Sequence, residues 1–285
     1  MRDLGKGRSK TEDTRKTSPN FIINDFRLFV QAALDSISGY AQLDTGAVST
    51  MVASSVSDSF KKIGVSTLRG AFGELRTEVV VVGHVKLLGA TFQNVRARVQ
   101  PEEHAGFTEL PFRPIMTAGV DLLFETDTAL RLDFRQGSAS YVSDSAEVSS
   151  VHQENSIPFH FMTPYRLVVF RSEMGNIKLG STLFDTGAGF SVLNSERFDE
   201  LGPHLKREEP VETTDPTGGK TKIPVFRHDN FHIGGVAFGS VRFLVIDLAS
   251  IEKGLHGKVD FILGLDTMLG HTWTIHLSTQ KLGWW

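Results

Sequence analysis

Two aspartates stand in nearly identical surroundings, Asp44 in the stretch LDTGA and Asp185 in the stretch FDTGA. Each follows apolar residues that suit a buried strand and precedes a glycine that allows a sharp turn. Two carboxylates brought within hydrogen-bonding distance cannot both ionise cheaply, so they share one proton and titrate as a coupled pair. One can then act as a base and the other as an acid, which predicts acid–base chemistry at these two positions.

The residues that follow each aspartate fit the same chemistry. The threonine hydroxyls can bond across a two-fold axis, the glycines let the backbone turn beneath the carboxylates, and the alanines leave room for a substrate main chain. These supporting residues are Thr45, Gly46, Ala47, Thr186, Gly187 and Ala188.

The aspartate loops belong to a repeat that spans most of the chain. Four landmarks recur in the same order, with offsets of 139, 141, 146 and 145 residues: RLFV at 27–30 with RLVV at 166–169, LDTGA with FDTGA, LGATFQNVRARV at 88–99 with GGVAFGSVRFLV at 234–245, and TAGVD at 117–121 with ILGLD at 262–266. Ordered landmarks at nearly constant offsets indicate a duplicated unit. Two similar lobes related by an approximate two-fold axis would bring Asp44 and Asp185 together.

Most segments favour strands. Four short segments draw on β-branched and aromatic residues and are bounded by Gly, Pro or Asp: EVVVVGHVKLL, FQNVRARVQ, VRFLVIDL and ALRLDF. A helical period is limited to residues 49–64 and 191–202, one short helix after each aspartate loop. The predicted organisation is a disordered polar tail at 1–20, an amino-terminal lobe at 21–142, a serine-rich linker at 143–156 and a carboxy-terminal lobe at 157–285.

Composition excludes several classes of function. With 40% hydrophobic and 22% charged residues the 285-residue chain resembles an ordinary globular protein, and its net charge of −3 offers no basic field for nucleic acid. No uncharged apolar stretch is long enough to span a bilayer. The chain has no cysteine, which excludes disulfides and a cysteine nucleophile and fits a reducing compartment. We expect a cytoplasmic monomer without metal or cofactor, periplasmic or secreted only if a leader is missing from this chain.

These motifs resemble the retropepsin-type aspartic proteases. D-T-G-A is followed in both halves by a short helix, a glycine-containing hairpin and a glycine motif, Ile262-Leu263-Gly264 in the second half. The resemblance covers about residues 21–285 and is similar to a single-chain, pepsin-like fusion of two retropepsin-like halves. Such enzymes are the standard example of two aspartates that share a proton. The resemblance implies two all-β barrel lobes with a cleft between them, an extended peptide substrate, and supporting roles for Gly119 and Gly264.

The resemblance also implies a flap over the cleft. The matching places are RGAFG at 69–73 and DPTGGK at 215–220, which make the flap or substrate-binding candidates Gly70, Phe72, Gly73, Gly218 and Gly219. Three features depart from pepsin-type enzymes: a phenylalanine near the tip of the first flap instead of tyrosine, alanine instead of serine after both D-T-G motifs, and Thr117-Ala118-Gly119 as a weaker glycine motif. The chain therefore leans toward the retroviral side of the family.

The predicted function is an aspartic endopeptidase in which Asp44 and Asp185 activate a water. One alternative is a protease fold that binds peptides without cutting them. Another is an actin-like or sugar-kinase-type ATPase, whose duplicated lobes also carry D-x-G loops but need several long helices.

Two further motifs are weaker. TDPTGGKT at 214–221 lacks the first glycine of a phosphate-binding P-loop, and a flap or turn explains it better. His228 and His232 have the spacing of helical zinc ligands, but no glutamate follows the first histidine, so two surface histidines near a strand are expected.

Overall fold

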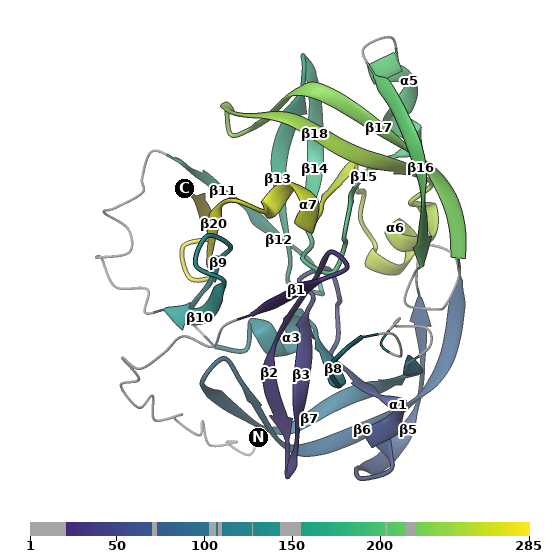
Figure 1. Ribbon diagram of the computed structural model, residues 1–285, viewed down its shortest axis with the longest axis vertical. Coiled ribbons are helices and arrows are strands. Elements are labelled where there is room, and N and C mark those ends of the chain that lie inside the picture. Colours follow the sequence, from purple (N-terminus) through teal and green to yellow (C-terminus); the bar gives the residue numbers. More distant parts are fainter. Residues whose placement is uncertain are drawn as a thin grey trace, which may run out of the picture.

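The computed structural model describes residues 21–69, 73–102, 107, 110–126, 128–142, 155–202, 205–214 and 220–285. These residues are mostly β-strand and form two lobes stacked along the long axis of the molecule, with the first half of the chain at the bottom and the second half at the top (Figure 1). The predicted all-β, two-lobe fold is confirmed. No helix in the described ranges has the length and apolar character needed to cross a bilayer.

An eight-stranded sheet forms the lower lobe. In spatial order its strands are β1 (Ile22–Asn24), β2 (Arg27–Leu34), β3 (Ile37–Leu43), β8 (Pro114–Ala118), β4 (Met51–Ala53), β7 (Ala90–Gln100), β6 (Glu74–Leu87) and β5 (Lys61–Arg69). β2 also pairs with β6, which closes the sheet into a barrel. Two one-turn helices, α1 (Ser54–Ser57) and α3 (Val120–Leu123), accompany it.

The upper lobe repeats this strand order. Its sheet runs β12 (His160–Met162), β13 (Leu167–Met174), β14 (Ile177–Phe184), β19 (Phe261–Leu263), β15 (Ser191–Asn194), β18 (Val236–Ile246), β17 (Lys220–Ile233) and β16 (Lys206–Thr214), with β13 also paired to β17. Its helices are η2 (Ser195–Arg197), α5 (Phe198–Leu201), α6 (Ala249–Leu255) and α7 (Leu265–Met268). The matching order of the two sheets agrees with the sequence repeat.

A third sheet joins the two lobes. It contains β10 (Ser138–Val142), β9 (Ala129–Asp133), β20 (Thr272–His276), β21 (Lys281–Trp284) and β11 (Ser156–Pro158). The central contact is the antiparallel pairing of β9 with β20, in which Leu132 lies opposite Trp273. The ring of Trp273 stacks on that of Trp284 at 5.7 Å, and both side chains are buried. Backbone hydrogen bonds and aromatic packing therefore hold the lobes in a defined orientation.

Buried β-branched and aromatic residues explain the strands. All four segments predicted as strands lie largely in strands, namely β6, β7, β18 and β9. β13 begins with four consecutive buried residues, Leu167 to Phe170, because it is covered on both faces. Side chains covered on both faces do not alternate with polar ones, so a continuous apolar run is what a central strand shows.

The helices expected after the aspartate loops are mostly wrong. In the first half, residues 51–53 form strand β4, α1 is a single turn, and β5 begins at residue 61. In the second half β15 occupies residues 191–194, and only η2 and α5 are helical. The cause is tertiary: Met51 and Val52 pair with β7 on one side and β8 on the other, and these ladders outweigh local helical spacing.

Candidate active site

Parallel strand pairs position the two aspartates. β3 ends at Leu43 beside Ala118 of β8, and β14 ends at Phe184 beside Leu263 of β19. The next residue in each strand is the aspartate: the amide of Asp44 donates to the carbonyl of Ala118 at 3.0 Å, and that of Asp185 to Leu263 at 3.1 Å. Both carboxyl groups thus stand at the ends of buried central strands, which limits their motion.

Gly119 and Gly264 lie where the chain passes closest to the aspartate loops. A Cβ atom on Gly119 would lie 2.8 Å from the carbonyl oxygen of Ala47, and one on Gly264 would lie 2.4 Å from the carbonyl carbon of Phe190. Both contacts are too close for any side chain, so the positions require glycine. The next residue after each glycine donates its amide to the loop, Val120 to Ala47 at 2.9 Å and Leu265 to Ala188 at 2.8 Å.

The structure brings the two aspartates together across the lobes. A Cβ on Gly46 would lie 2.2 Å from Cγ of Asp185, and a Cβ on Gly187 would lie 2.2 Å from Cγ of Asp44. Each glycine therefore lies against the carboxyl group of the opposite lobe, and the two carboxyls share a hydrogen bond. Replacing either glycine with a larger residue would displace a carboxyl group.

Backbone amides hold one oxygen of each carboxyl group. Oδ1 of Asp44 accepts from the amides of Gly46 at 3.0 Å and Ala47 at 2.8 Å. Oδ1 of Asp185 accepts from those of Gly187 at 2.8 Å and Ala188 at 3.2 Å. Because each loop fixes its own Oδ1 atom, the orientation of both carboxyl planes is determined by the backbone.

The two threonines form a reciprocal link between the loops. Thr45 Oγ1 donates to the carbonyl of Phe184 at 2.9 Å and accepts from the amide of Thr186 at 3.0 Å. Thr186 Oγ1 donates to the carbonyl of Leu43 at 2.8 Å and accepts from the amide of Thr45 at 3.1 Å. Both side chains are fully buried, so no water competes for these four bonds.

Burial and the neighbouring charge change the acidity of the pair. Burial, then the negative charge of Asp185, hold the pKa of Asp44 well above its ordinary value. Burial also raises the pKa of Asp185, while its amide hydrogen bonds act to lower it. The bond between the carboxyls raises the pKa of Asp44 and lowers that of Asp185, as expected when one proton is shared. The pair therefore keeps one proton at a pH where an isolated aspartate is ionised.

Part of the sequence and the overall fold are similar to those of known aspartic proteases. Residues 173–267, which contain the second aspartate loop and Gly264, match the family model described as aspartyl protease. The crystal structure of an aspartic proteinase from Irpex lacteus superposes with a TM-score of 0.57 at 15% identity, covering 94% of this chain and 96% of that one. The expected resemblance to aspartic proteases is confirmed. A search of curated proteins found no match.

Each lobe of this chain contains a supporting pair that sequence reasoning missed. Asp121 Oδ1 accepts from both the amide and the hydroxyl of Thr50 at 2.8 Å. Asp266 Oδ1 accepts from the amide and the hydroxyl of Ser191 at 2.9 Å. These residues recur in the repeat: Thr50 and Ser191 stand six positions after Asp44 and Asp185, and Asp121 and Asp266 stand two positions after Gly119 and Gly264. That recurrence is the signal that could have identified them.

Removing Asp266 should loosen the second aspartate loop. In Asp266→Ala the amide and hydroxyl of Ser191 lose their acceptor, so we expect about 1 to 3 kcal/mol less stability at pH 5. Burial raises the pKa of Asp266 to about 6. The stability that this side chain adds to the folded protein is therefore fully present below the ordinary pKa of 3.8 and is lost as the pH rises through about 6. The cost should therefore be about 1 kcal/mol smaller at pH 8. Urea unfolding at both pH values measures this.

The matched control is Asp58→Ala, because the Asp58 side chain is 92% exposed. It should change stability by less than about 0.5 kcal/mol at either pH. A cost for Asp266→Ala that grows between pH 5 and pH 8 would contradict the raised pKa.

Both lobes of the fold contain the hairpin expected for a flap. β5 and β6 pair up to Arg69 opposite Glu74, and β16 and β17 pair up to Thr214 opposite Lys220. Gly73 directly precedes β6. The other flap candidates, Gly70, Phe72, Gly218 and Gly219, lie outside the described residues, as does most of the predicted linker, 143–154.

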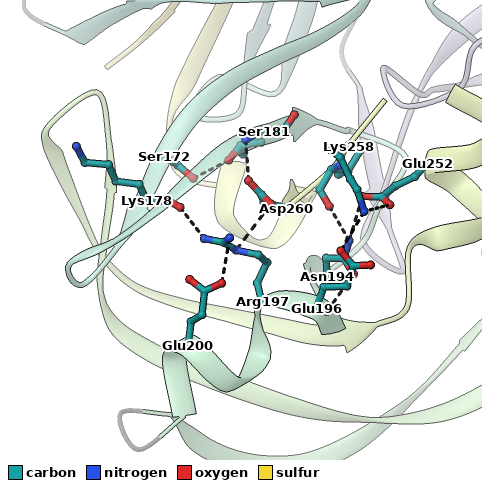
Figure 2. A network of polar contacts seen from close by, with 12 residues as sticks. Ser172, Lys178, Ser181, Asn194, Glu196, Arg197, Glu200, Glu252, Lys258 and Asp260 are labelled. Carbon is teal, nitrogen blue, oxygen red and sulfur yellow. Dashed lines mark hydrogen bonds and ion pairs between the residues drawn. The ribbon is translucent and has the colours of Figure 1, made fainter. Parts of the chain in front are cut away.

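The first hairpin approaches the opposite lobe at helix α6. A Cβ on Gly254 of α6 would lie 3.7 Å from Cδ of Arg69. Glu252 holds α6 in place: its Oε1 accepts from the amide of Val259 at 2.9 Å and from Nδ2 of Asn194 at 3.2 Å. Its Oε2 forms an ion pair with Lys258 at 3.0 Å, and Figure 2 shows the contacts with Asn194 and Lys258. The polar groups in this network satisfy one another, so it is structural support for α6.

The two histidines are not arranged as metal ligands. His228 and His232 lie on strand β17, not on a helix, and the described ranges contain no group of three or more potential metal ligands. His232 is on the strand as expected, but His228 is only 7% exposed, so the expectation of a surface histidine is wrong there. Most of the P-loop-like stretch, residues 215–219, lies outside the described residues.

Proposed function

We propose that the chain is an aspartic endopeptidase that hydrolyses peptide bonds with a water activated between Asp44 and Asp185. The observation that carries the proposal is the pair of carboxyl groups, hydrogen-bonded to each other and each held at Oδ1 by two amides of its own loop. We place the attacking water between the two carboxyl groups.

The chemistry follows from the shared proton. The ionised carboxylate takes a proton from the water as the water attacks the scissile carbonyl, and the protonated carboxyl donates to the developing oxyanion. Proton transfer to the amine then breaks the C–N bond and releases the two peptides. The proton present before the reaction belongs to the pair, because burial raises the pKa of both Asp44 and Asp185.

The substrate we propose is a peptide in an extended conformation. The β5–β6 and β16–β17 hairpins occupy the places where the resemblance implies flaps, and strand-like flaps bind extended peptides through main-chain hydrogen bonds. Two hairpins of this kind and alanine after both D-T-G motifs favour the retroviral side of the family. We further propose that one chain holds one complete site, so that the enzyme acts as a monomer. We also propose that it is cytoplasmic, because the chain has no cysteine.

The alternatives fit the structure less well. The longest helix in the described part of the chain is α6 with seven residues, whereas an actin-like or sugar-kinase fold needs several long helices. A peptide-binding protein without activity would need neither the adjacent buried aspartates nor the interlocked threonines, and this chain has both features.

A peptide library tests the proposal. Purified protein is incubated with randomised peptides between about pH 3 and pH 8, with and without a statine-type inhibitor, and cleavage sites are read by mass spectrometry. We expect cleavage that the inhibitor blocks. Cleavage at no pH would support the silent peptide-binding alternative, and nucleotide hydrolysis would support the ATPase.

Activity should depend on pH as a bell-shaped curve. The reaction needs one proton on the pair, so rates fall when both carboxyls are protonated and again when both are ionised. Burial and mutual repulsion raise the pKa values of the pair, which moves the alkaline limb upward from the range of free aspartates. Initial rates measured from about pH 3 to pH 9 check this. A rate that still rises through pH 9 would exclude the shared-proton pair.

A further inference from the structure

The two lobes differ in chemistry at matched positions beside the site. In the sequence repeat, Arg98 of β7 corresponds to Leu244 of β18, and Ser49 corresponds to Phe190, each five positions after its aspartate. Leu244 is 2% exposed, and the Phe190 ring packs on that of Phe26 at 5.1 Å. The lower lobe therefore presents an arginine and a serine where the upper lobe presents apolar side chains.

Arg98 connects two structural parts that border the site. Its Nη1 donates to Oγ of Ser49, in the loop that begins with the catalytic aspartate. Its Nε donates to Oγ of Ser66 at 3.2 Å, and Ser66 lies on β5, the strand that leads into the first flap hairpin. The guanidinium group thus lies between the aspartate loop and β5, the strand that leads into the first hairpin.

The charge of Arg98 has no acidic partner among the described residues. Three other half-buried arginines each pair with a carboxylate, namely Arg27, Arg131 and Arg197. Among the described residues the guanidinium group of Arg98 hydrogen-bonds only to the two serine hydroxyls, which leaves three of its five N–H groups without a described partner. Asp121 is near enough to interact electrostatically, but no ion pair forms, and its Oδ1 is occupied by Thr50.

A half-buried cation without a partner is costly, and an anionic ligand group that reaches it gains affinity from both charge and hydrogen bonds. We propose that Arg98 is a specificity-determining residue that binds an acidic side chain, glutamate or aspartate, of the peptide substrate on the lower-lobe side of the scissile bond. The inference rests on the proposed endopeptidase function. It predicts an asymmetric preference, because the matched position in the upper lobe is Leu244.

The test compares peptide pairs that differ only in glutamate against glutamine, with each position scanned in turn, at about pH 6. At one position the unmodified protein should show a kcat/KM for glutamate about 10- to 100-fold above that for glutamine. In Arg98→Met the ratio should fall to about one, because kcat/KM for the glutamate peptides falls more than kcat/KM for the glutamine peptides. Arg98→Lys should keep part of the preference, and Arg98→Glu should favour lysine.

Arg96→Met is the matched control, because Arg96 lies two residues earlier on the same strand and is exposed. It should leave the ratio unchanged. A loss that affects both peptides equally in Arg98→Met, with a lower melting temperature, would show a structural link only and overturn the inference. Cleavage by the unmodified protein without acidic preference would overturn the inference alone, whereas no cleavage of any peptide would overturn the proposed function as well.

Discussion

Peptide hydrolysis should be abolished in Asp44→Asn and in Asp185→Asn, with kcat/KM reduced by at least about 10³-fold in each. An asparagine cannot take a proton from water or donate one to the oxyanion, so the remaining aspartate has no partner for the shared proton. The amide donors to Oδ1 remain, and asparagine can accept them with its own oxygen. Initial rates on a cleaved library peptide measure the loss.

Both variants should remain folded, and stability serves as their control. Burial raises the pKa values of both carboxyls. The stability that they add to the folded protein is therefore fully present below the ordinary aspartate pKa, and it is lost as the pH rises through the raised values. Asparagine carries no charge, so at pH 7 each variant should be at least as stable as the unmodified protein. A folded variant that keeps its activity would contradict the assignment of the catalytic pair.

Mixing the two variants tests whether the site forms within one chain. In the structure the aspartates meet inside a single chain, each next to the opposite lobe's glycine. The predicted 14-residue linker at 143–156 also gives the partner lobe an effective concentration on the order of millimolar. A mixture of Asp44→Asn and Asp185→Asn should therefore recover no activity. Recovery would show that lobes pair between chains.

The second large effect is expected at the threonine link. Thr45→Val keeps the shape of the side chain but leaves the carbonyl of Phe184 and the amide of Thr186 without partners in a buried region. Two unsatisfied buried groups should cost about 3 to 5 kcal/mol in the free energy of unfolding. Activity should fall with it, because the same loops hold both carboxyls. Chemical denaturation and initial rates give the two quantities.

The controls separate the hydroxyl from other effects. Thr45→Ser retains the hydroxyl and should recover most of the stability, and Thr67→Val, at an exposed position on β5, should cost less than about 0.5 kcal/mol. Thr45→Val combined with Thr186→Val should cost less than the sum of the single changes, because the four bonds form one network. Full additivity would contradict a shared network.

Local sequence was sufficient for much of the fold. Valine-rich stretches such as residues 78–88 became strands because their side chains are β-branched and their positions are covered by the barrel. The helix expected at residues 49–64 failed because Met51 and Val52 find strand partners that are distant in sequence. A helical spacing over a dozen residues carries no information about such partners.

For the site, the sequence by itself determined which residues could do the chemistry: the duplicated D-T-G-A loops name both aspartates and the threonines and glycines beside them. Only the tertiary structure decided how the carboxyls are held, that Asp121 and Asp266 brace the loops, and that Arg98 lies between Ser49 and Ser66 without an acidic partner among the described residues. The reason is that two aspartates 141 residues apart come together through the pairing of β9 with β20 and the packing of two barrels. Neither contact is encoded in any local stretch of the chain.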